Sequence, residues 1–178
     1  MKKVLVISSS PKKGNSDALA DSFARGAAES GNTVEKIRIA DKKINYCKGC
    51  NYCSEHSAPC VQKDDADEII GKMVEADVIV LATPVYFYSM SAQLKTLIDR
   101  CAARYTEISG KDFYYILTAA DTGMNAFEKT IEALRGFTVD CLDGANERAI
   151  ITAGGVWLTG DINNSLALEN AYKEGLNV

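Results

Sequence analysis

The sequence predicts a doubly wound α/β fold, in which helices cover both faces of one parallel sheet. Short apolar runs rich in β-branched residues alternate five times with longer amphipathic stretches along the 178 residues. Right-handed crossovers then restrict the topology to a doubly wound sandwich. At about 100–200 residues per domain, this length predicts a single domain over residues 1–178.

Each predicted strand is a short apolar run, and each predicted helix carries an apolar face. The third strand, DVIVLA, is apolar enough to be buried on both faces. In the first helix Leu19, Phe23 and Ala27 share one face, and Gly31 follows its end. The predicted strands are 4–8, 33–39, 77–82, 112–119 and 147–152, and the predicted helices are 15–30, 64–75, 91–104, 125–137 and 164–175.

Composition and charge exclude several classes of protein. Twenty basic and 24 acidic residues give a net charge of −4. No basic excess exists to hold a nucleic acid or an anionic membrane, so neither partner is expected. The first apolar run, 4–7, is shorter than the ~7–15 residues of a signal peptide's apolar region, and no stretch approaches a span of ~18 residues. We therefore expect a cytoplasmic protein, where clustered cysteines are more often metal-binding or redox-active than disulfide-bonded.

The loop after the first strand, SSSPKKGNS (8–16), is a candidate phosphate site. In doubly wound sheets ligands bind at the carboxyl ends of the strands. This loop brings hydroxyls, an amide and a cation to a helix N-terminus, which suits a phosphate group. It matches neither G-x-G-x-x-G nor the P-loop pattern. The alternative is ordinary helix capping by Asn15 or Ser16 after a turn, but the position at the end of the first strand favours phosphate.

Two further loops reach the same edge of the sheet. Residues 83–90 contain three consecutive aromatics, Tyr86, Phe87 and Tyr88, which suit a flat, partly apolar ring. The alternative is that they cap the core or contact another subunit. The loop at 119–125 begins with small and polar residues that would let a planar ligand approach the backbone, although a plain turn would have the same composition.

Four of the six cysteines form the pattern C-x2-C-x2-C-x6-C in the segment 45–62, which is predicted to be an irregular loop. The spacing is similar to the bacterial [4Fe–4S] run, apart from the last gap. Three alternatives remain: a zinc site that uses four of the five groups formed by these cysteines and His56, a redox-active disulfide such as Cys47–Cys50, or free thiols. The other two cysteines, Cys101 and Cys141, are predicted to be buried and inert. The candidate cluster ligands are Cys47, Cys50, Cys53 and Cys60.

Five segments resemble the flavodoxin-like NADPH-dependent FMN reductase family, and most closely its iron–sulfur flavoprotein branch. They are ISSSPKKGNSD (7–17), CKGCNYCSEHSAPC (47–60), KDDADEI (63–69), LATPVYFYSMSAQLKTLIDR (81–100) and GGVWLTGDI (154–162). The resemblance implies a flavodoxin-like five-stranded parallel sheet of order 2-1-3-4-5. It also implies bound FMN and assembly as a homodimer or homotetramer.

The resemblance also implies roles for individual residues. Lys12 stands where many members have arginine, which keeps the charge but loses the planar fork. The FMN phosphate would be held by Ser8, Ser10, Lys12, Asn15 and Ser16. The isoalloxazine ring would be held by Pro84, Val85, Tyr86 and Phe87, with Ala119, Ala120, Asp121 and Gly123 near its other side.

These features predict an FMN-dependent NAD(P)H oxidoreductase that reduces quinone, nitro, azo or flavin acceptors. The flavin carries the chemistry, so no catalytic side chain is assigned. The first alternative is an electron carrier that uses FMN and a [4Fe–4S] cluster to relay electrons between redox proteins. The second is a binding module for another phosphorylated ligand, which the aromatic loop disfavours.

Overall fold

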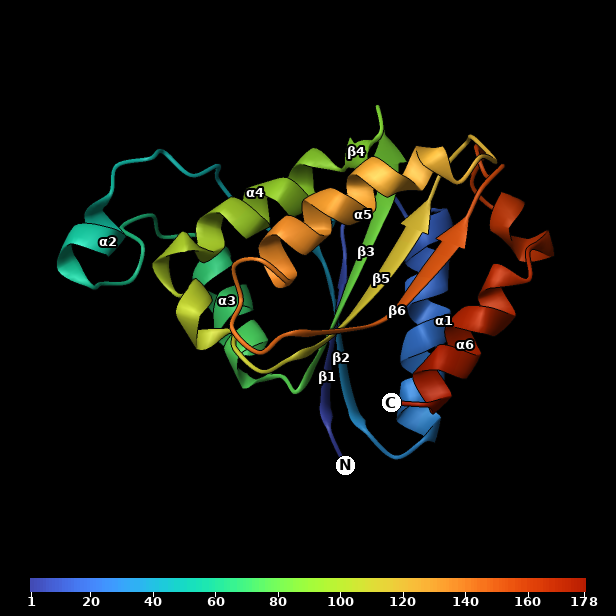
Figure 1. The fold of residues 1–178 in the computed structure, drawn as a ribbon, viewed down its shortest axis with the longest axis horizontal. Coiled ribbons are helices and arrows are strands. Elements are labelled where there is room, and N and C mark those ends of the chain that lie inside the picture. The colour runs from blue at the N-terminus through green and yellow to red at the C-terminus, as the bar shows by residue number, and fades with distance from the viewer.

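The computed structural model describes residues 1–178 and confirms the doubly wound fold (Figure 1). The parallel strands lie in the order β2-β1-β3-β5-β6, which is the predicted order 2-1-3-4-5. The unpredicted sixth strand, β4, pairs antiparallel with the end of β3. The strands are β1 (Lys3–Ser8), β2 (Thr33–Arg38), β3 (Val78–Tyr86), β4 (Ser89–Met90), β5 (Asp112–Thr118) and β6 (Asn146–Ala153).

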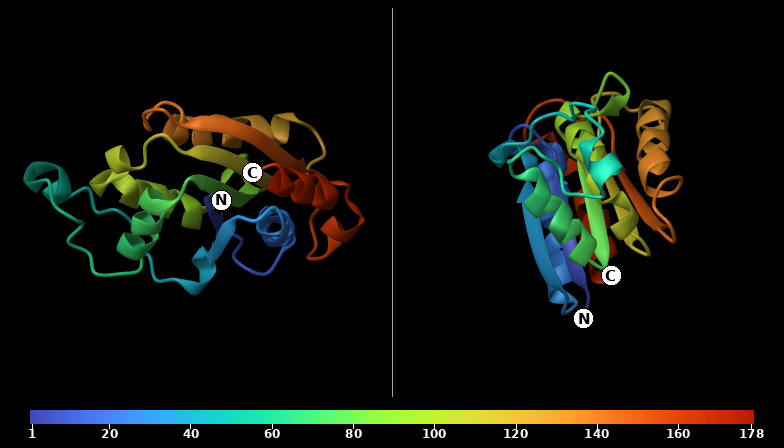
Figure 2. Two further views of the ribbon diagram at one scale, coloured as in Figure 1. Left: turned by 90° about the horizontal axis from the view of Figure 1, so that it is seen from below. Right: turned by 90° about the vertical axis from the view of Figure 1, so that its left-hand side faces the viewer.

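Two groups of helices cover the two faces of the sheet (Figure 2). On one face α1 and α6 pack together, and on the other face lie α3, α4 and α5. Successive side chains of β1 alternate between these cores, as the two-residue period of a strand requires. The helices are α1 (Asn15–Glu29), α2 (Tyr52–His56), α3 (Ala66–Glu75), α4 (Ala92–Arg100), α5 (Asn125–Thr138) and α6 (Ala167–Leu176).

Two glycines let α1 and α6 approach each other at backbone distance. A Cβ atom on Gly26 would lie 2.2 Å from the carbonyl oxygen of Tyr172. A Cβ atom on Gly175 would lie 2.2 Å from the carbonyl oxygen of Phe23. No side chain fits at either place, so this contact depends on glycine in both helices.

Several predicted boundaries were wrong, and the segment 45–62 is not wholly irregular. It contains the short helix α2, flanked by Asn51 and Ser57 at φ values of 57° and 46°. The third strand continues to Tyr86 because its end pairs with β4. The helix predicted over 91–104 stops being α-helical at Arg100 and continues as 3₁₀ turns. The last helix begins at Ala167, after a separate 3₁₀ turn at Asp161–Asn164.

No helix in the structure is both long enough and apolar enough to cross a membrane. The cytoplasmic location and the single-domain organisation stay predictions.

Candidate functional site

A cleft of about 310 Å³ opens at the carboxyl ends of the parallel strands. It brings together the three loops selected from the sequence and adds a fourth segment, which follows β6. The cleft is lined by Ser10, Lys12, Gly14, Asn15, Ser16, Pro84, Val85, Tyr86, Thr118, Ala119, Ala120, Val156, Trp157, Leu158 and Thr159.

The N-terminus of α1 makes one end of this cleft suitable for an anion. Gly14 occupies the N-cap position, and no side chain caps the first turn of the helix. The hydroxyl of Ser16 is buried and has no hydrogen-bond partner. Free N–H groups at a helix N-terminus and an unpaired buried hydroxyl are donors that a phosphate group would satisfy. The residues present therefore fit the phosphate of FMN.

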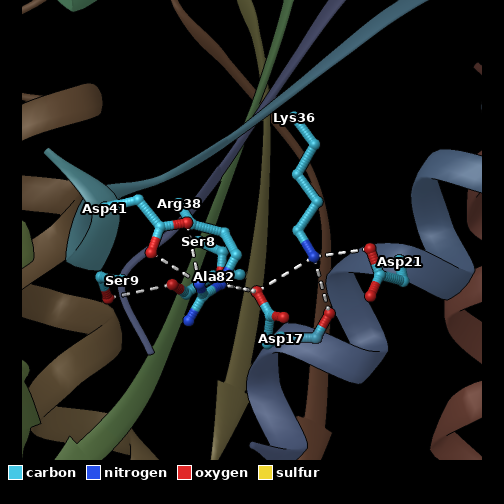
Figure 3. Close-up of polar contacts among 8 residues, drawn as sticks. All are labelled: Ser8, Ser9, Asp17, Asp21, Lys36, Arg38, Asp41 and Ala82. Atoms are coloured by element: carbon cyan, nitrogen blue, oxygen red, sulfur yellow. Dashed lines mark hydrogen bonds and ion pairs between the residues drawn. The ribbon is translucent and has the colours of Figure 1, made fainter. Parts of the chain in front are cut away.

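An ionic network around the buried carboxylate of Asp17 lies next to this loop (Figure 3). The carboxylate of Asp17 accepts a 2.6 Å hydrogen bond from Ser8 and lies 3.0 Å from Lys36 Nζ and 3.4 Å from Arg38 Nε. Two cations thus offset a negative charge that would otherwise oppose an anion at the start of α1. The hydroxyl of Ser8 is committed to Asp17, and Ser8 does not line the cleft. Outer contacts are Lys36–Asp21, Arg38–Asp41 and the hydroxyl of Ser9 with the Ala82 carbonyl.

The side chain of Asn15 joins the first loop to the segment after β6. Its amide nitrogen donates to the carbonyl oxygen of Leu158 at 2.9 Å. Its amide oxygen accepts from the N–H groups of Gly160 and Ile162 at 3.2 and 3.4 Å. Asn15 lines the cleft, but its side chain is occupied by this loop, so its backbone N–H is the group left for a phosphate.

Replacing Asn15 by alanine should loosen the segment 157–162 and weaken cofactor binding. The change removes three hydrogen bonds, each of which contributes about 1 kcal/mol. We expect faster amide hydrogen exchange in this segment and a lower affinity for FMN. Asn163→Ala, a change just after this segment and away from the contact, should alter neither. Unchanged exchange in Asn15→Ala would contradict the role assigned to this side chain.

An apolar hollow of about 380 Å³ continues the cleft on the aromatic side. The two share Val85, Tyr86, Ala119, Ala120 and Trp157. A polar end and an apolar end therefore meet in one continuous surface, which suits a ligand with a phosphate at one end and a flat ring at the other. The hollow is lined by Val85, Tyr86, Phe87, Tyr88, Ala119, Ala120, Asp121, Ala126 and Trp157.

The tip of the β3–β4 hairpin presents aromatic side chains in a strained backbone conformation. Phe87 and Tyr88 have φ values of 50° and 61°. Tight hairpin turns of this kind favour Asn and Gly, and the left-handed region costs other residues about 1–2 kcal/mol each. Phe87 is fully exposed, and Lys129 Nζ lies 5.3 Å from the centre of the Tyr88 ring. Strain that holds an aromatic side chain in solvent is typical of a binding surface.

The structure brings most of the predicted flavin residues to the cleft or the hollow, but neither Ser8 nor Gly123. The N–H of Gly123 instead donates to Asp121 Oδ1 at 2.8 Å and closes a turn. For Trp157 the sequence left three roles open: a wall of the flavin site, a contact with a neighbouring subunit, or core packing. Its side chain is 77% exposed and lines both the cleft and the hollow, so it is not a core residue. The sequence feature that pointed to this region was the segment GGVWLTGDI. Its first residue, Gly154, allows a close backbone contact after β6, because a Cβ atom there would lie 2.7 Å from the carbonyl oxygen of Asp121. The other lining residues that were missed are Gly14, Thr118, Val156, Leu158 and Thr159 in the cleft and Ala126 in the hollow.

The cysteine segment projects from the edge of the molecule, away from α6 and the segment after β6 (Figures 1 and 2). Cys47 and Cys50 are exposed, and Cys53 and Cys60 are half-buried. The four thiols are not gathered around one point, and no group of three metal-binding side chains is positioned to hold an ion. Four thiols on one exposed loop are nevertheless the donor set that an iron–sulfur cluster takes.

The remaining two cysteines differ from each other. Cys101 is buried as predicted, and burial raises the pKa of its thiol to about 12. Cys141 is exposed, so its predicted burial is wrong. It lies in the turn that follows α5, beyond the helix face that packs on the sheet.

The strand order, and the ligand cleft at the point where that order reverses between β1 and β3, are those of a flavodoxin-like fold. The chain belongs to the NADPH-dependent FMN reductase family, whose model matches residues 2–144. This match confirms the family resemblance seen in the sequence.

Curated relatives match a shorter segment. An iron-sulfur flavoprotein of Archaeoglobus fulgidus is 44% identical over 100 residues, which are 56% of this chain and 45% of that protein. An iron-sulfur flavoprotein of Methanocaldococcus jannaschii is 50% identical over 99 residues, which are 55% of this chain and 51% of that protein. The matched segment thus spans about half the length of these relatives.

Solved structures match the whole fold at low identity. An azoreductase from Bacillus anthracis has a TM-score of 0.77 and 17% identity, with all of both chains covered. An NAD(P)H:quinone oxidoreductase from Methanothermobacter marburgensis has a TM-score of 0.77 and 18% identity, over 99% of this chain and 96% of that one. At this identity the likeness concerns the fold alone.

Proposed function

We propose that this protein is an FMN-dependent oxidoreductase that takes electrons from NAD(P)H and reduces quinone, nitro, azo or flavin acceptors. One observation carries the proposal. The cleft joins an uncapped helix N-terminus, with an unpaired buried hydroxyl on Ser16, to an apolar aromatic hollow. FMN has a phosphate at one end and a flat ring at the other, and membership of the FMN reductase family supports the same ligand.

In this proposal the chain positions the cofactor and supplies no acid or base. Ser10, Lys12 and Ser16 hold the phosphate, together with the N–H groups of the first turn of α1. When bound, FMN accepts a hydride and passes electrons on singly or in pairs. The exposed indole of Trp157 limits access of water from the rim. The ring is held by Pro84, Val85, Tyr86, Phe87, Ala119, Ala120 and Asp121.

The second candidate function is electron transfer between redox proteins through FMN and a [4Fe–4S] cluster. The observation that favours it is the spacing of Cys47, Cys50, Cys53 and Cys60 on one exposed loop. The names of the relatives, iron-sulfur flavoproteins at 44% and 50% identity, point the same way. A homodimer or homotetramer is proposed for either function, because the fully exposed Phe87 at the hairpin tip would gain cover from a second copy.

Steady-state oxidation of NADPH and NADH by the FMN-loaded protein, with a quinone as acceptor, tests the main proposal. Acceptor-dependent turnover is expected. A protein that holds FMN but shows no turnover with either nucleotide would contradict the reductase proposal and favour the electron carrier. Failure to bind FMN is distinguished from failure to turn over, because a protein without FMN is colourless.

Replacing Ser16 by alanine should weaken FMN binding by about tenfold or more. A hydrogen bond to a charged group contributes about 1.5–3 kcal/mol, and 1.4 kcal/mol corresponds to a tenfold change in affinity. The comparison is a fluorescence titration of wild type and variant with FMN. Ser30→Ala, at the other end of the same helix, should bind FMN as wild type does. Equal affinities in all three proteins would show that the phosphate lies elsewhere.

A further inference from the structure

Asp17 places a buried negative charge beside the proposed phosphate site. It lies in the first turn of α1, next to Ser16, and its side chain is 5% exposed. The free N–H groups at the start of this helix favour an anion, and the carboxylate of Asp17 opposes it, because like charges repel. The site therefore holds a phosphate better when the charge of Asp17 is offset by other groups.

Two cations on β2 offset this charge from outside the cleft. Lys36 Nζ lies 3.0 Å from Asp17 Oδ1 and donates to the backbone carbonyl of Asp17 at 3.3 Å. Arg38 Nε lies 3.4 Å from the same carboxylate oxygen. The two cationic side chains are 17% and 16% exposed, and neither lines the cleft. Figure 3 shows both of them reaching from β2 toward the start of α1.

The outer partners of these cations are exposed carboxylates. Lys36 also pairs with Asp21, and Arg38 also pairs with Asp41. The side chains of Asp21 and Asp41 are 64% and 63% exposed, so solvent and salt screen their charges. The buried part of the network is therefore one carboxylate, that of Asp17, between two cations.

We propose that Lys36 and Arg38 are positioning residues for the flavin phosphate, and that they act through Asp17. The inference rests on the proposed function and deepens it. Both cations neutralise Asp17 while its carboxylate keeps the hydrogen bond from Ser8 that fixes the start of the phosphate loop. The start of α1 can then accept a phosphate monoester, which carries a charge of about −1.5 to −2 at neutral pH. The two residues thus favour FMN over riboflavin, which has the same ring and no phosphate, although neither touches the ligand.

Lys36→Gln removes one of the two cations and tests this role. Cofactor-free wild type and variant are titrated with FMN and with riboflavin at low ionic strength. Two unit charges about 10 Å apart, at an effective dielectric constant of about 20, interact strongly enough to change an affinity about tenfold. We expect the affinity for FMN to fall about three- to tenfold and that for riboflavin to stay unchanged, since riboflavin carries no charge to be repelled. Arg38→Gln should act in the same direction. Lys72→Gln removes the same charge at the amino ends of the strands and should match wild type.

A second comparison separates charge from structure. Asp17→Asn is made in wild type and in Lys36→Gln, and the four proteins are compared. Asparagine keeps an oxygen that accepts from Ser8 but carries no charge, so the double variant should regain an FMN affinity close to that of wild type. Three results would each overturn the inference and leave FMN binding in place: unchanged FMN affinity in Lys36→Gln, an equal loss for both flavins, or no recovery in the double variant. A wild-type chain that binds no FMN would overturn the proposed function, and this inference with it.

Discussion

Replacing Gly26 by alanine is expected to lower the free energy of unfolding by about 3 kcal/mol or more. The new methyl group would lie 2.2 Å from the carbonyl oxygen of Tyr172 and 3.0 Å from the backbone nitrogen of Leu176. Neither atom can move without shifting α6 as a whole. Since small domains have only about 5–15 kcal/mol of net stability, this single methyl group removes a large part of it.

The matched control for Gly26→Ala is Gly136→Ala. Gly136 lies inside α5, and a Cβ atom there meets nothing within 4 Å. Alanine is the better helix former by about 1 kcal/mol, so this variant should be as stable as wild type or more stable. Both variants are compared by urea unfolding. FMN affinity should fall with Gly26→Ala as well, because α6 begins at Ala167, shortly after the segment 157–162 held by Asn15. Equal stability of the two variants would contradict the close backbone packing of α1 and α6.

Replacing Arg100 by alanine should cost about 3–5 kcal/mol, because it leaves the carboxylate of Asp64 buried without its partner. Urea unfolding at neutral pH measures this loss. Arg104→Ala, one turn further along and in an exposed pair with Glu107, should leave the unfolding midpoint nearly unchanged. Arg100 and Asp64 both form hydrogen bonds to Asn45, so the pair joins the two ends of the cysteine segment. A similarly small effect from both changes would show that the pair does not stabilise this junction.

The same pair predicts a pH dependence of stability. Burial raises the pKa of Asp64, but hydrogen bonds from Arg100 and from the backbone of Asn45 and Ala66 outweigh it and hold the pKa well below its usual range. The native carboxyl group thus stays ionised where the unfolded one is protonated. Its contribution is complete above the ordinary pKa of about 3.9 and is lost as the pH falls toward the lower native value. The difference in stability between wild type and Asp64→Asn should therefore shrink in acid, and a constant difference would contradict this account.

Local patterns in the sequence were enough to predict the five parallel strands and the five main helices, because each strand is a short apolar run and each helix carries an apolar face. They could not reveal that β3 runs on to Tyr86, since the strand is extended by pairing with β4. They also could not reveal the role of Gly26, which depends on a carbonyl group almost 150 residues away.

The candidate site was predictable in outline from the position of its loops. Ser10, Lys12 and Ser16 line the cleft because the first loop meets the N-terminus of α1. Ser8 was misplaced because its side chain turns to the buried carboxylate of Asp17. The role of Trp157 stayed open because the segment after β6 is brought to the cleft by Asn15, a contact that no local pattern records.

The claim that this cleft holds FMN by its phosphate at the start of α1 is tested most directly by titrating the cofactor-free protein with FMN and with riboflavin. Riboflavin carries the same ring but lacks the phosphate. We expect one FMN per chain and an affinity for riboflavin at least about tenfold lower, as the loss of one or more charged hydrogen bonds requires. Equal affinities for the two flavins, or no binding of FMN, would contradict the account.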